Sequence, residues 1–300
     1  MPIIQVNDLD IAYETQGDSR NPPILLIVGL GMQLVSWPDS FCDALVQRGF
    51  YVIRFDNRDS GLSTKLHHLG KPNTLLAVLK MALRMKLSAG YRLDDMADDA
   101  IGLLDALGID KAHILGVSMG GMIAQIVAAR YPTRTLSLTS MMSTSGRRGL
   151  PGPTPAARKV LFAVPPNDPV AIVDHFVHTI EVIGSAQYPT SRATLKERVA
   201  RSVERSLEPV ATSRQLLAIG ASGDRVALLK TISVPTLVIH GTADPLIPID
   251  CGRETAKLIP NAVMHEIEGM GHDLPDQLND MLAELISEHC HVGVCASIEK

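Results

Sequence analysis

The chain has 300 residues, a length that can bury a large core in one domain, with or without an insertion. Hydrophobic residues make up 46% of it and charged residues 20%, which is typical of globular proteins. The net charge of −4 and the aromatic content of 4% argue against a nucleic-acid partner, which needs a dense basic face or a platform for stacked bases.

The N-terminal residues contain no basic stretch followed by an apolar one, so no secretory signal is visible. No run along the chain reaches the roughly 18 apolar residues that a membrane span requires. We therefore expect a cytoplasmic protein without stable membrane insertion.

Apolar runs of strand length alternate with amphipathic segments of helix length, which is the pattern of an α/β fold. The run Ile24–Val28 is apolar throughout, as expected for a strand that is buried on both faces of a sheet. The other strands and helices expected before residue 143 are Leu9–Thr15, Tyr51–Phe55, Ala112–Gly116 and Leu136–Leu138 as strands, and Pro38–Gln47, Leu93–Leu107 and Gly120–Tyr131 as helices.

The segment Thr74–Leu87 is rich in leucine and methionine, and Lys80 and Arg84 lie one helical turn apart in it. We interpret it as a helix that packs beside a cap formed by residues 143–229, because a packed helix needs no special partner. The alternative is a lid within the core that meets acyl chains or a lipid surface.

The alternation of strands and helices stops between Ser143 and Leu229. This stretch begins with Gly146–Pro155, which is rich in glycine and proline, and continues with helical patterns at Val170–Ile183 and Leu195–Leu207. We interpret residues 143–229 as a helical cap, inserted into a core that residues 1–142 and 230–300 form.

Two further strands, Pro235–His240 and Ala262–Ile267, and a final helix, Gln277–Glu288, complete the expected core. The tail that follows holds His289, Cys290, His291 and Cys295. These side chains are too crowded for a zinc site and no second cluster completes them, so we expect a frayed tail and no metal. The four cysteines do not form the framework of a disulfide-rich protein.

The strongest chemical signal is Gly116-Val117-Ser118-Met119-Gly120, a G-x-S-x-G sequence between an expected strand and an expected helix. A turn this sharp leaves no space for side chains at Gly116 and Gly120, and it lifts the Ser118 hydroxyl above the sheet. The N-terminus of the following helix favours the negative charge that develops there. The motif therefore predicts that Ser118 is a nucleophile.

A serine hydroxyl is a weak nucleophile, so it needs a histidine base and a carboxylate that orients this base. In this fold the acid and then the histidine follow the serine, each in a loop after a late strand. Asp244 and His272 meet both conditions, and we expect a Ser118–His272–Asp244 triad. The competing candidates fit less well: His265, Asp250, Asp273 and Asp276.

An oxyanion hole needs two backbone N–H donors. One is expected from Met119, directly after the nucleophile. The other is expected from Leu30, in the turn that Gly29 and Gly31 form after the Ile24–Val28 strand. The charged residues Arg54, Asp56 and Arg58 are interpreted as ion pairs that brace a nearby loop, rather than as a second catalytic centre.

The chain resembles the α/β-hydrolase superfamily over nearly its full length, and within it the branch of aclacinomycin methylesterases and proline iminopeptidases. The matching stretches are Val28–Gly31, Trp37-Pro38, Arg54–Ser63, Gly116–Gly121, Pro235–Pro245 and Gly269–Pro275. The resemblance implies a mostly parallel sheet of eight strands, a helical cap and no cofactor. One difference is that many relatives have His-Gly where this chain has Val28-Gly29, so its oxyanion loop is anchored differently.

These features predict a serine esterase that cleaves a small-molecule carboxylic ester through an acyl-enzyme. Dehalogenases and epoxide hydrolases of this fold carry aspartate where this chain has Ser118. Hydrolysis of amides, of N-terminal proline peptides or of carbon–carbon bonds remains an alternative. A non-catalytic receptor of the same fold is an alternative from another class, and an intact triad argues against it. The sequence indicates no oligomeric state.

Overall fold

The computed structural model describes residues 1–73, 80, 85, 87–166 and 168–298. Within these residues the chain forms an eight-stranded sheet with the order β1-β2-β4-β3-β5-β6-β7-β8. Its strands are β1 (Ile3–Val6), β2 (Leu9–Gln16), β3 (Pro23–Ile27), β4 (Tyr51–Phe55), β5 (Ala112–Val117), β6 (Thr135–Met141), β7 (Thr236–Gly241) and β8 (Val263–Ile267). β2 pairs antiparallel with β1 and β4, and the other pairs are parallel. The predicted fold class is therefore confirmed.

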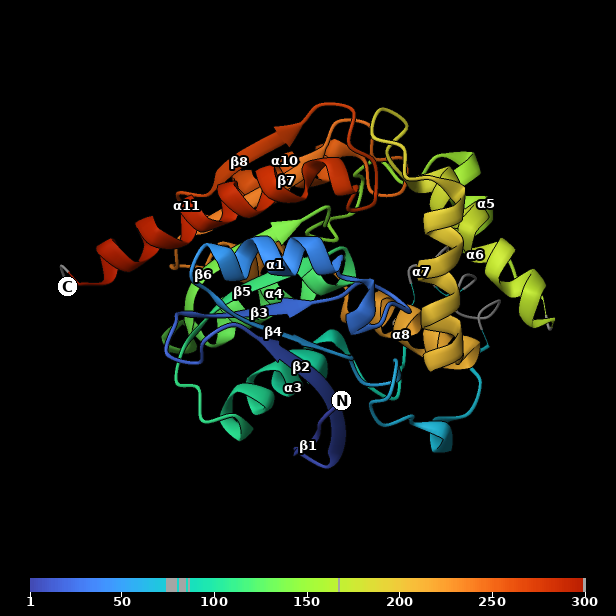
Figure 1. Ribbon diagram of the computed structural model, residues 1–300, viewed down its shortest axis with the longest axis horizontal. Helices are drawn as coiled ribbons and strands as arrows, with labels where there is room; N and C mark the ends of the chain where they lie inside the picture. The colour runs from blue at the N-terminus through green and yellow to red at the C-terminus, as the bar shows by residue number, and fades with distance from the viewer. Residues whose placement is uncertain (74–79, 81–84, 86, 167, 299–300) are drawn as a thin grey trace.

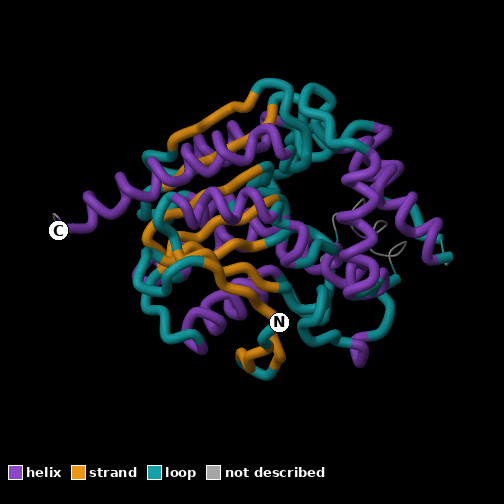
Figure 2. Tube along the Cα trace, viewed as in Figure 1, coloured by secondary structure: helices purple, strands orange, loops and turns teal. Residues whose placement is uncertain are grey.

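Helices cover both faces of this sheet (Figure 2). In β3, Leu25 and Ile27 belong to the apolar layer beneath α3 and α4, while Ile24 and Leu26 belong to the layer beneath α1 and α11. This alternation follows from the period of two along a strand, and it explains why the run is apolar throughout. The core helices are α1 (Asp39–Gln47), α3 (Leu93–Ala106), α4 (Met119–Arg130), α10 (Ile249–Leu258) and α11 (Asn279–Ile298), with 3-10 turns η1 (Leu34–Ser36), η2 (His67–Leu69), η3 (Pro132–Arg134) and η4 (Asp276–Leu278).

All described elements between β6 and β7 are helices, and Figure 1 shows most of them gathered at one end of the sheet. They are α5 (Pro155–Leu161), α6 (Pro169–Ile183), α7 (Arg192–Arg205), α8 (Pro209–Ser222) and α9 (Val226–Leu229). We call residues 143–229 the insertion. Val177, Leu195 and Val199 form a small apolar core of its own between α6 and α7.

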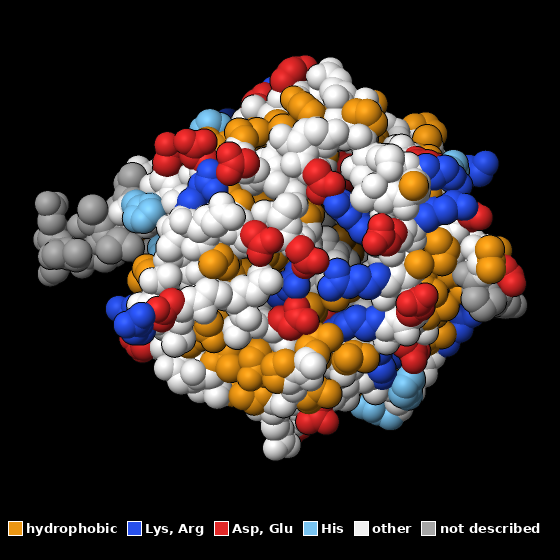
Figure 3. Space-filling model, in the orientation of Figure 1, with side chains coloured by type: hydrophobic (Ala, Val, Ile, Leu, Met, Phe, Trp, Pro, Cys, Tyr) orange, Lys and Arg blue, Asp and Glu red, His pale blue; other side chains and the backbone are white. Residues whose placement is uncertain are grey.

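The loop of residues 56–63, which we call the brace loop, follows β4 and holds the insertion to the core. Asp56 is fully buried, accepts hydrogen bonds from the backbone N–H groups of Leu34 and Leu62, and forms an ion pair of 2.6 Å with Arg205 of α7. Figure 3 shows basic and acidic side chains side by side over this junction.

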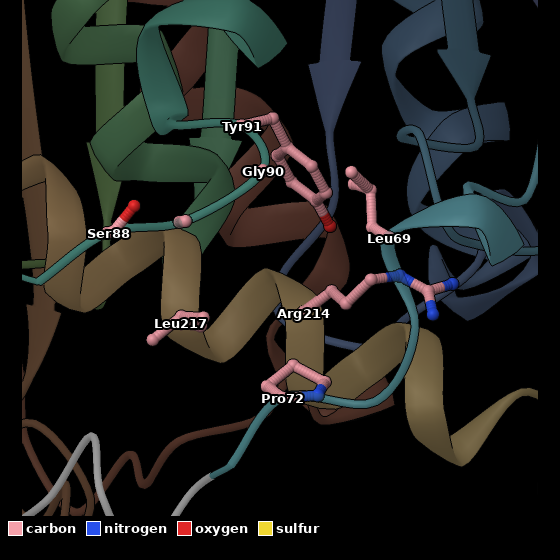
Figure 4. Close-up of a pocket in the computed structure, with 8 residues that line it drawn as sticks. Leu69, Pro72, Ser88, Gly90, Tyr91, Arg214 and Leu217 are labelled. Carbon is pink, nitrogen blue, oxygen red and sulfur yellow. The ribbon is translucent and has the colours of Figure 1, made fainter.

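A second buried ion pair joins the brace loop to α8. Arg214 donates two hydrogen bonds to the Asp59 carboxylate, at 2.8 and 2.7 Å, and the Tyr91 hydroxyl donates a third at 2.9 Å. Figure 4 shows Arg214 extending from α8 beneath the Tyr91 hydroxyl. Burial alone would raise the pKa of Asp59, but the bonds from Arg214, the Leu66 N–H and Tyr91 outweigh burial and lower it.

The expected structural pairing near this loop is observed. Arg58 pairs with Asp99 at 2.6 Å, and Arg54 pairs with Glu14 at 2.8 Å and with Asp39 at 2.9 Å. These pairs fix the direction in which the brace loop leaves the sheet.

Several elements differ from the sequence-based expectations. The strand β1 and the helices α5, α8, α9 and α10 were not predicted. The helix α11 continues to Ile298, so the prediction of a frayed tail is wrong. Cys290 is buried on α11, and no group of three or more metal-ligating side chains occurs within the described part of the chain. No described helix is long and apolar enough to cross a membrane. The expected helix at residues 74–87 lies almost wholly outside the described residues, so its role as packed helix or lid stays a prediction.

Candidate active site

Ser118 lies in the turn between β5 and α4, where its φ of 54° and ψ of −119° are unusual for a residue with a side chain. Gly116 and Gly120 must be glycines, because a Cβ atom at either position would collide with the backbone. A Cβ atom on Gly116 would lie 2.1 Å from the Gly120 carbonyl oxygen, and a Cβ on Gly120 would lie 2.0 Å from the Ile27 carbonyl oxygen. The turn thus has the geometry that the G-x-S-x-G motif predicts.

The structure brings the three predicted triad residues together. His272 Nε2 lies 3.0 Å from Ser118 Oγ, and His272 Nδ1 lies 2.7 Å from Asp244 Oδ2. An ionised carboxylate only accepts hydrogen bonds, so Nδ1 carries the proton and Nε2 is left to accept the proton of the serine hydroxyl. His272 and Asp244 are buried and Ser118 is half-buried, so only the nucleophile is partly open to solvent.

Asp244 is held from both of its oxygens. Oδ1 accepts hydrogen bonds from the backbone N–H groups of Leu246 at 2.9 Å and Ile247 at 2.8 Å, while Oδ2 faces His272. Burial alone would raise the pKa of Asp244, but His272, His240 and the Ile247 N–H hold it far below its usual range. The carboxylate is therefore ionised at neutral pH and can stabilise a positive charge on His272.

The two residues expected to supply the oxyanion donors, Leu30 and Met119, both lie in segments next to Ser118. Met119 is the first residue of α4, where backbone N–H groups have no acceptor within the helix. The Gly29–Gly31 turn passes close to the nucleophile, since a Cβ on Gly29 would lie 3.3 Å from Ser118 Cβ. Among the described groups, none accepts a hydrogen bond from the Leu30 N–H. The role of the Leu30 and Met119 N–H groups as oxyanion donors stays a prediction.

The competing candidate residues lie elsewhere or have other partners. His265 is exposed on β8. The three competing acids bind partners other than the His272 ring: Asp250 pairs with Arg253, Asp276 with Arg198, and Asp273 accepts a hydrogen bond from Ser185.

Two residues near the site were not identified from the sequence. His240 is fully buried, bonds the Ile247 carbonyl oxygen at 2.7 Å, and has Nε2 3.5 Å from Asp244 Oδ2. Ser143 donates a hydrogen bond of 2.8 Å to the Ser118 carbonyl oxygen. The signal for His240 was its position at the end of a buried strand, four residues before Asp244.

Two clefts lie beside the insertion rather than at the triad. One, of about 290 Å³, is lined by Tyr91, Arg214 and Leu217 among others (Figure 4). The other, of about 520 Å³, is lined by Leu87, Met122 and other residues. Ser118 and His272 line neither of them.

Replacing Asp244 by asparagine is expected to lower kcat by about 10⁴-fold, less than loss of His272, which is expected to cost about 10⁶-fold. The amide removes the charge that stabilises protonated His272 and no longer selects the Nδ1–H form of the ring. Steady-state kinetics of the two purified variants on one ester would test this order. An Asp244→Asn variant as active as the unmodified protein would contradict it.

The alpha/beta hydrolase fold family matches residues 22–277. The chain belongs to this family. This membership confirms the resemblance expected from the motifs, and it identifies the protein as a hydrolase of the α/β fold.

Several known proteins are similar to the chain over most of its length. It is 29% identical to rhodomycin D methylesterase DnrP of Streptomyces peucetius, with 96% of this chain and 97% of the relative covered. It is 27% identical to the putative carbamate hydrolase RutD of Variovorax paradoxus, with 88% and 90% covered.

Solved structures show the same fold at lower identity. The meta-cleavage product hydrolase CumD of Pseudomonas fluorescens IP01 is 22% identical, with a TM-score of 0.75 and coverage of 96% of this chain and 97% of the other. The enol-lactonase of Burkholderia xenovorans LB400 is 23% identical, with a TM-score of 0.71 and coverage of 96% and 99%.

Proposed function

We propose that the chain hydrolyses carboxylic esters through an acyl-enzyme on Ser118. The observation that carries this proposal is the continuous hydrogen-bonded series from Ser118 Oγ through His272 to Asp244, with distances of 3.0 and 2.7 Å. Such a series allows a neutral hydroxyl to lose its proton as it attacks a carbonyl carbon.

In the first half of the reaction, Ser118 Oγ forms a bond to the ester carbonyl carbon, and its proton moves to His272 Nε2. The carbonyl oxygen becomes negative and accepts hydrogen bonds from the N–H groups of Leu30 and Met119. The carbon–oxygen bond to the alcohol then breaks. The alcohol leaves with the proton from His272, and the acyl group stays on Ser118.

In the second half, water attacks the acyl carbon and gives its proton to His272 Nε2. The second oxyanion collapses, the bond to Ser118 Oγ breaks, and the serine recovers its proton from His272 as the acid leaves. Asp244 keeps the ring oriented in both halves and balances its positive charge, without itself taking the proton.

An ester substrate is supported by the similarity to a methylesterase over almost the whole chain. We also propose that the insertion serves as a cap over the site, because its backbone contacts the base. The Ile183 carbonyl oxygen, at the end of α6, accepts a hydrogen bond of 2.8 Å from the His272 backbone N–H. The insertion is therefore placed to contribute to the choice of substrate.

The carboxylates of the insertion argue against an aminopeptidase. A cationic amino terminus would need a buried acid near the nucleophile. The insertion contains seven acidic residues and, in the structure, none of them is buried: Asp168, Asp174, Glu181, Glu197, Glu204, Glu208 and Asp224. Arg192 pairs with Asp174 and Glu181, and Asp168 caps α6. An apolar substrate is therefore favoured.

p-Nitrophenyl esters are expected to be cleaved faster as the acyl chain grows from acetate, until the chain outgrows the pocket. Each buried methylene contributes about 0.8 kcal/mol, which is about fourfold in kcat/KM. The measurement is kcat/KM for the series from acetate to palmitate, beside prolyl-naphthylamide. Faster cleavage of the naphthylamide than of p-nitrophenyl butyrate would favour an aminopeptidase instead.

A carbon–carbon bond hydrolase is a second candidate, since the fold is shared with CumD. It would be favoured if vinylogous diketones were cleaved while simple esters were not. A fluorophosphonate probe distinguishes a non-catalytic receptor from both enzymes, because it phosphonylates only an activated serine, with loss of fluoride. Mass spectrometry should find the probe on Ser118, and a protein that takes up no label would favour a receptor.

A further inference from the structure

The turn that carries Leu30 is tied to the insertion by one side chain. Gln215, on α8, accepts a hydrogen bond of 2.9 Å from the Gly31 backbone N–H through Oε1. Its Nε2 donates a hydrogen bond of 2.8 Å to the Arg58 carbonyl oxygen in the brace loop. A single amide therefore joins the oxyanion turn to the loop that holds the insertion.

The orientation of this amide is fixed by its partners. The Gly31 N–H can only donate and the Arg58 carbonyl oxygen can only accept. A flipped amide would place its NH₂ group against the Gly31 N–H and its oxygen against the Arg58 oxygen, and neither pair could form a hydrogen bond. Gln215 is fully buried, where an unpaired amide group is costly. Loss of either hydrogen bond would therefore leave a buried polar group without its partner.

The position of α8 is itself rigid at this point. Arg214, the preceding residue, is held by its two hydrogen bonds to Asp59. On the turn side, a Cβ on Gly31 would lie 2.9 Å from the Thr212 side chain, so α8 packs directly against the turn. Gln215 therefore holds the turn from a fixed support.

We propose that Gln215 is a positioning residue for the oxyanion hole, an inference that rests on the proposed function. Its bond to the Gly31 N–H fixes the Leu30–Gly31 peptide plane, and this restricts the adjoining peptide that carries the Leu30 N–H. Without Gln215 the Gly31 peptide is free to rotate, and the Leu30 donor is no longer held toward the carbonyl oxygen. Preorganised donors act on the transition state rather than on substrate binding.

The test uses Gln215→Met, which keeps the side-chain volume and removes both hydrogen bonds. We expect kcat for p-nitrophenyl butyrate to fall by about 10- to 100-fold, with KM within about threefold of the unmodified value, because loss of one oxyanion donor costs 10²–10³-fold. The rate at which a fluorophosphonate phosphonylates Ser118 should fall in parallel with kcat. If Gln215→Met does not fold, Gln215→Asn keeps the amide but is one methylene too short to reach both partners, and the same changes are expected.

Gln125→Leu is the matched control. Gln125 is also fully buried, donates one hydrogen bond to Ser140 and accepts one from Arg225, and contacts neither oxyanion donor. Gln125→Leu should lower the midpoint of thermal unfolding, as Gln215→Met does, but leave kcat within about threefold of the unmodified value.

Three outcomes would overturn the inference. Normal kcat in folded Gln215→Met, or equal losses of kcat in the Gln215 and Gln125 variants, would overturn it alone. Absence of both ester hydrolysis and fluorophosphonate labelling in the unmodified protein would overturn the proposed function, and the inference with it.

Discussion

Ser118→Ala is expected to lower kcat for ester hydrolysis by about 10⁶-fold, and His272→Ala by a similar factor. Without the serine oxygen no acyl-enzyme forms, and without the histidine the hydroxyl keeps its proton. The double variant of Ser118→Ala with His272→Ala should lose about as much kcat as either single variant, because the two residues act in one step. The measurements are single-turnover rates, with circular dichroism to show that each variant is folded.

His265→Ala is the control for the histidine. This residue is exposed on β8, seven positions before His272, and it should leave kcat nearly unchanged. If His265→Ala abolished activity and His272→Ala did not, the base would be misassigned. Near-normal activity of folded Ser118→Ala would exclude the whole mechanism.

Asp59→Asn is expected to destabilise the protein by about 3–5 kcal/mol, because it leaves the Arg214 guanidinium buried without its carboxylate. Asparagine is chosen since residue 59 has a φ of 64°, which asparagine tolerates. The lowered pKa of Asp59 means that the ionised form stabilises the fold at neutral pH, and that this contribution is lost as the pH falls below the ordinary value of 3.8. Urea unfolding at pH 7 should show a lower free energy of unfolding for Asp59→Asn than for the unmodified protein. At pH 3 this difference should be smaller.

Glu266→Gln provides the comparison for this ion pair. Arg253 donates two hydrogen bonds of 2.8 Å to Glu266, the same two-bond geometry, but Arg253 is 51% exposed. Loss of this ion pair should cost much less stability than loss of the buried Asp59–Arg214 pair, because solvent screens it. The double variant of Asp59→Asn with Arg214→Met should lose less stability than the sum of the single variants, and simple additivity would contradict a coupled pair.

The sheet could be predicted from the sequence because its central strands are apolar on both faces, as Ile24–Ile27 illustrates. Only one of the four β1 side chains, that of Val6, is buried, so β1 carries no such pattern. α8 was missed because it buries Arg214 and Gln215 rather than a regular apolar stripe. α11 continues past its predicted end, and Cys290 there lies against Ser137 of β6 at 3.6 Å, a tertiary contact that local sequence does not contain.

The candidate triad could be predicted because each member lies beside a local signal: a glycine-bounded turn for Ser118, and a loop after a late strand for Asp244 and His272. The residues that support the site have no such signal. Gln215 meets Gly31 across 184 positions of the chain, and only the packed structure brings the two together. Side chains that act through long-range hydrogen bonds therefore stay hidden in a single sequence.

The backbone of Ser118 has a consequence for the evolution of the protein. A residue with a side chain in this conformation costs of the order of 1–3 kcal/mol, which glycine would largely avoid. The proposed nucleophile is therefore a residue whose backbone conformation lowers the stability of the fold. Selection for a more stable protein would favour losing the hydroxyl, and selection for catalysis opposes that loss, so the two pressures act in opposite directions on one codon.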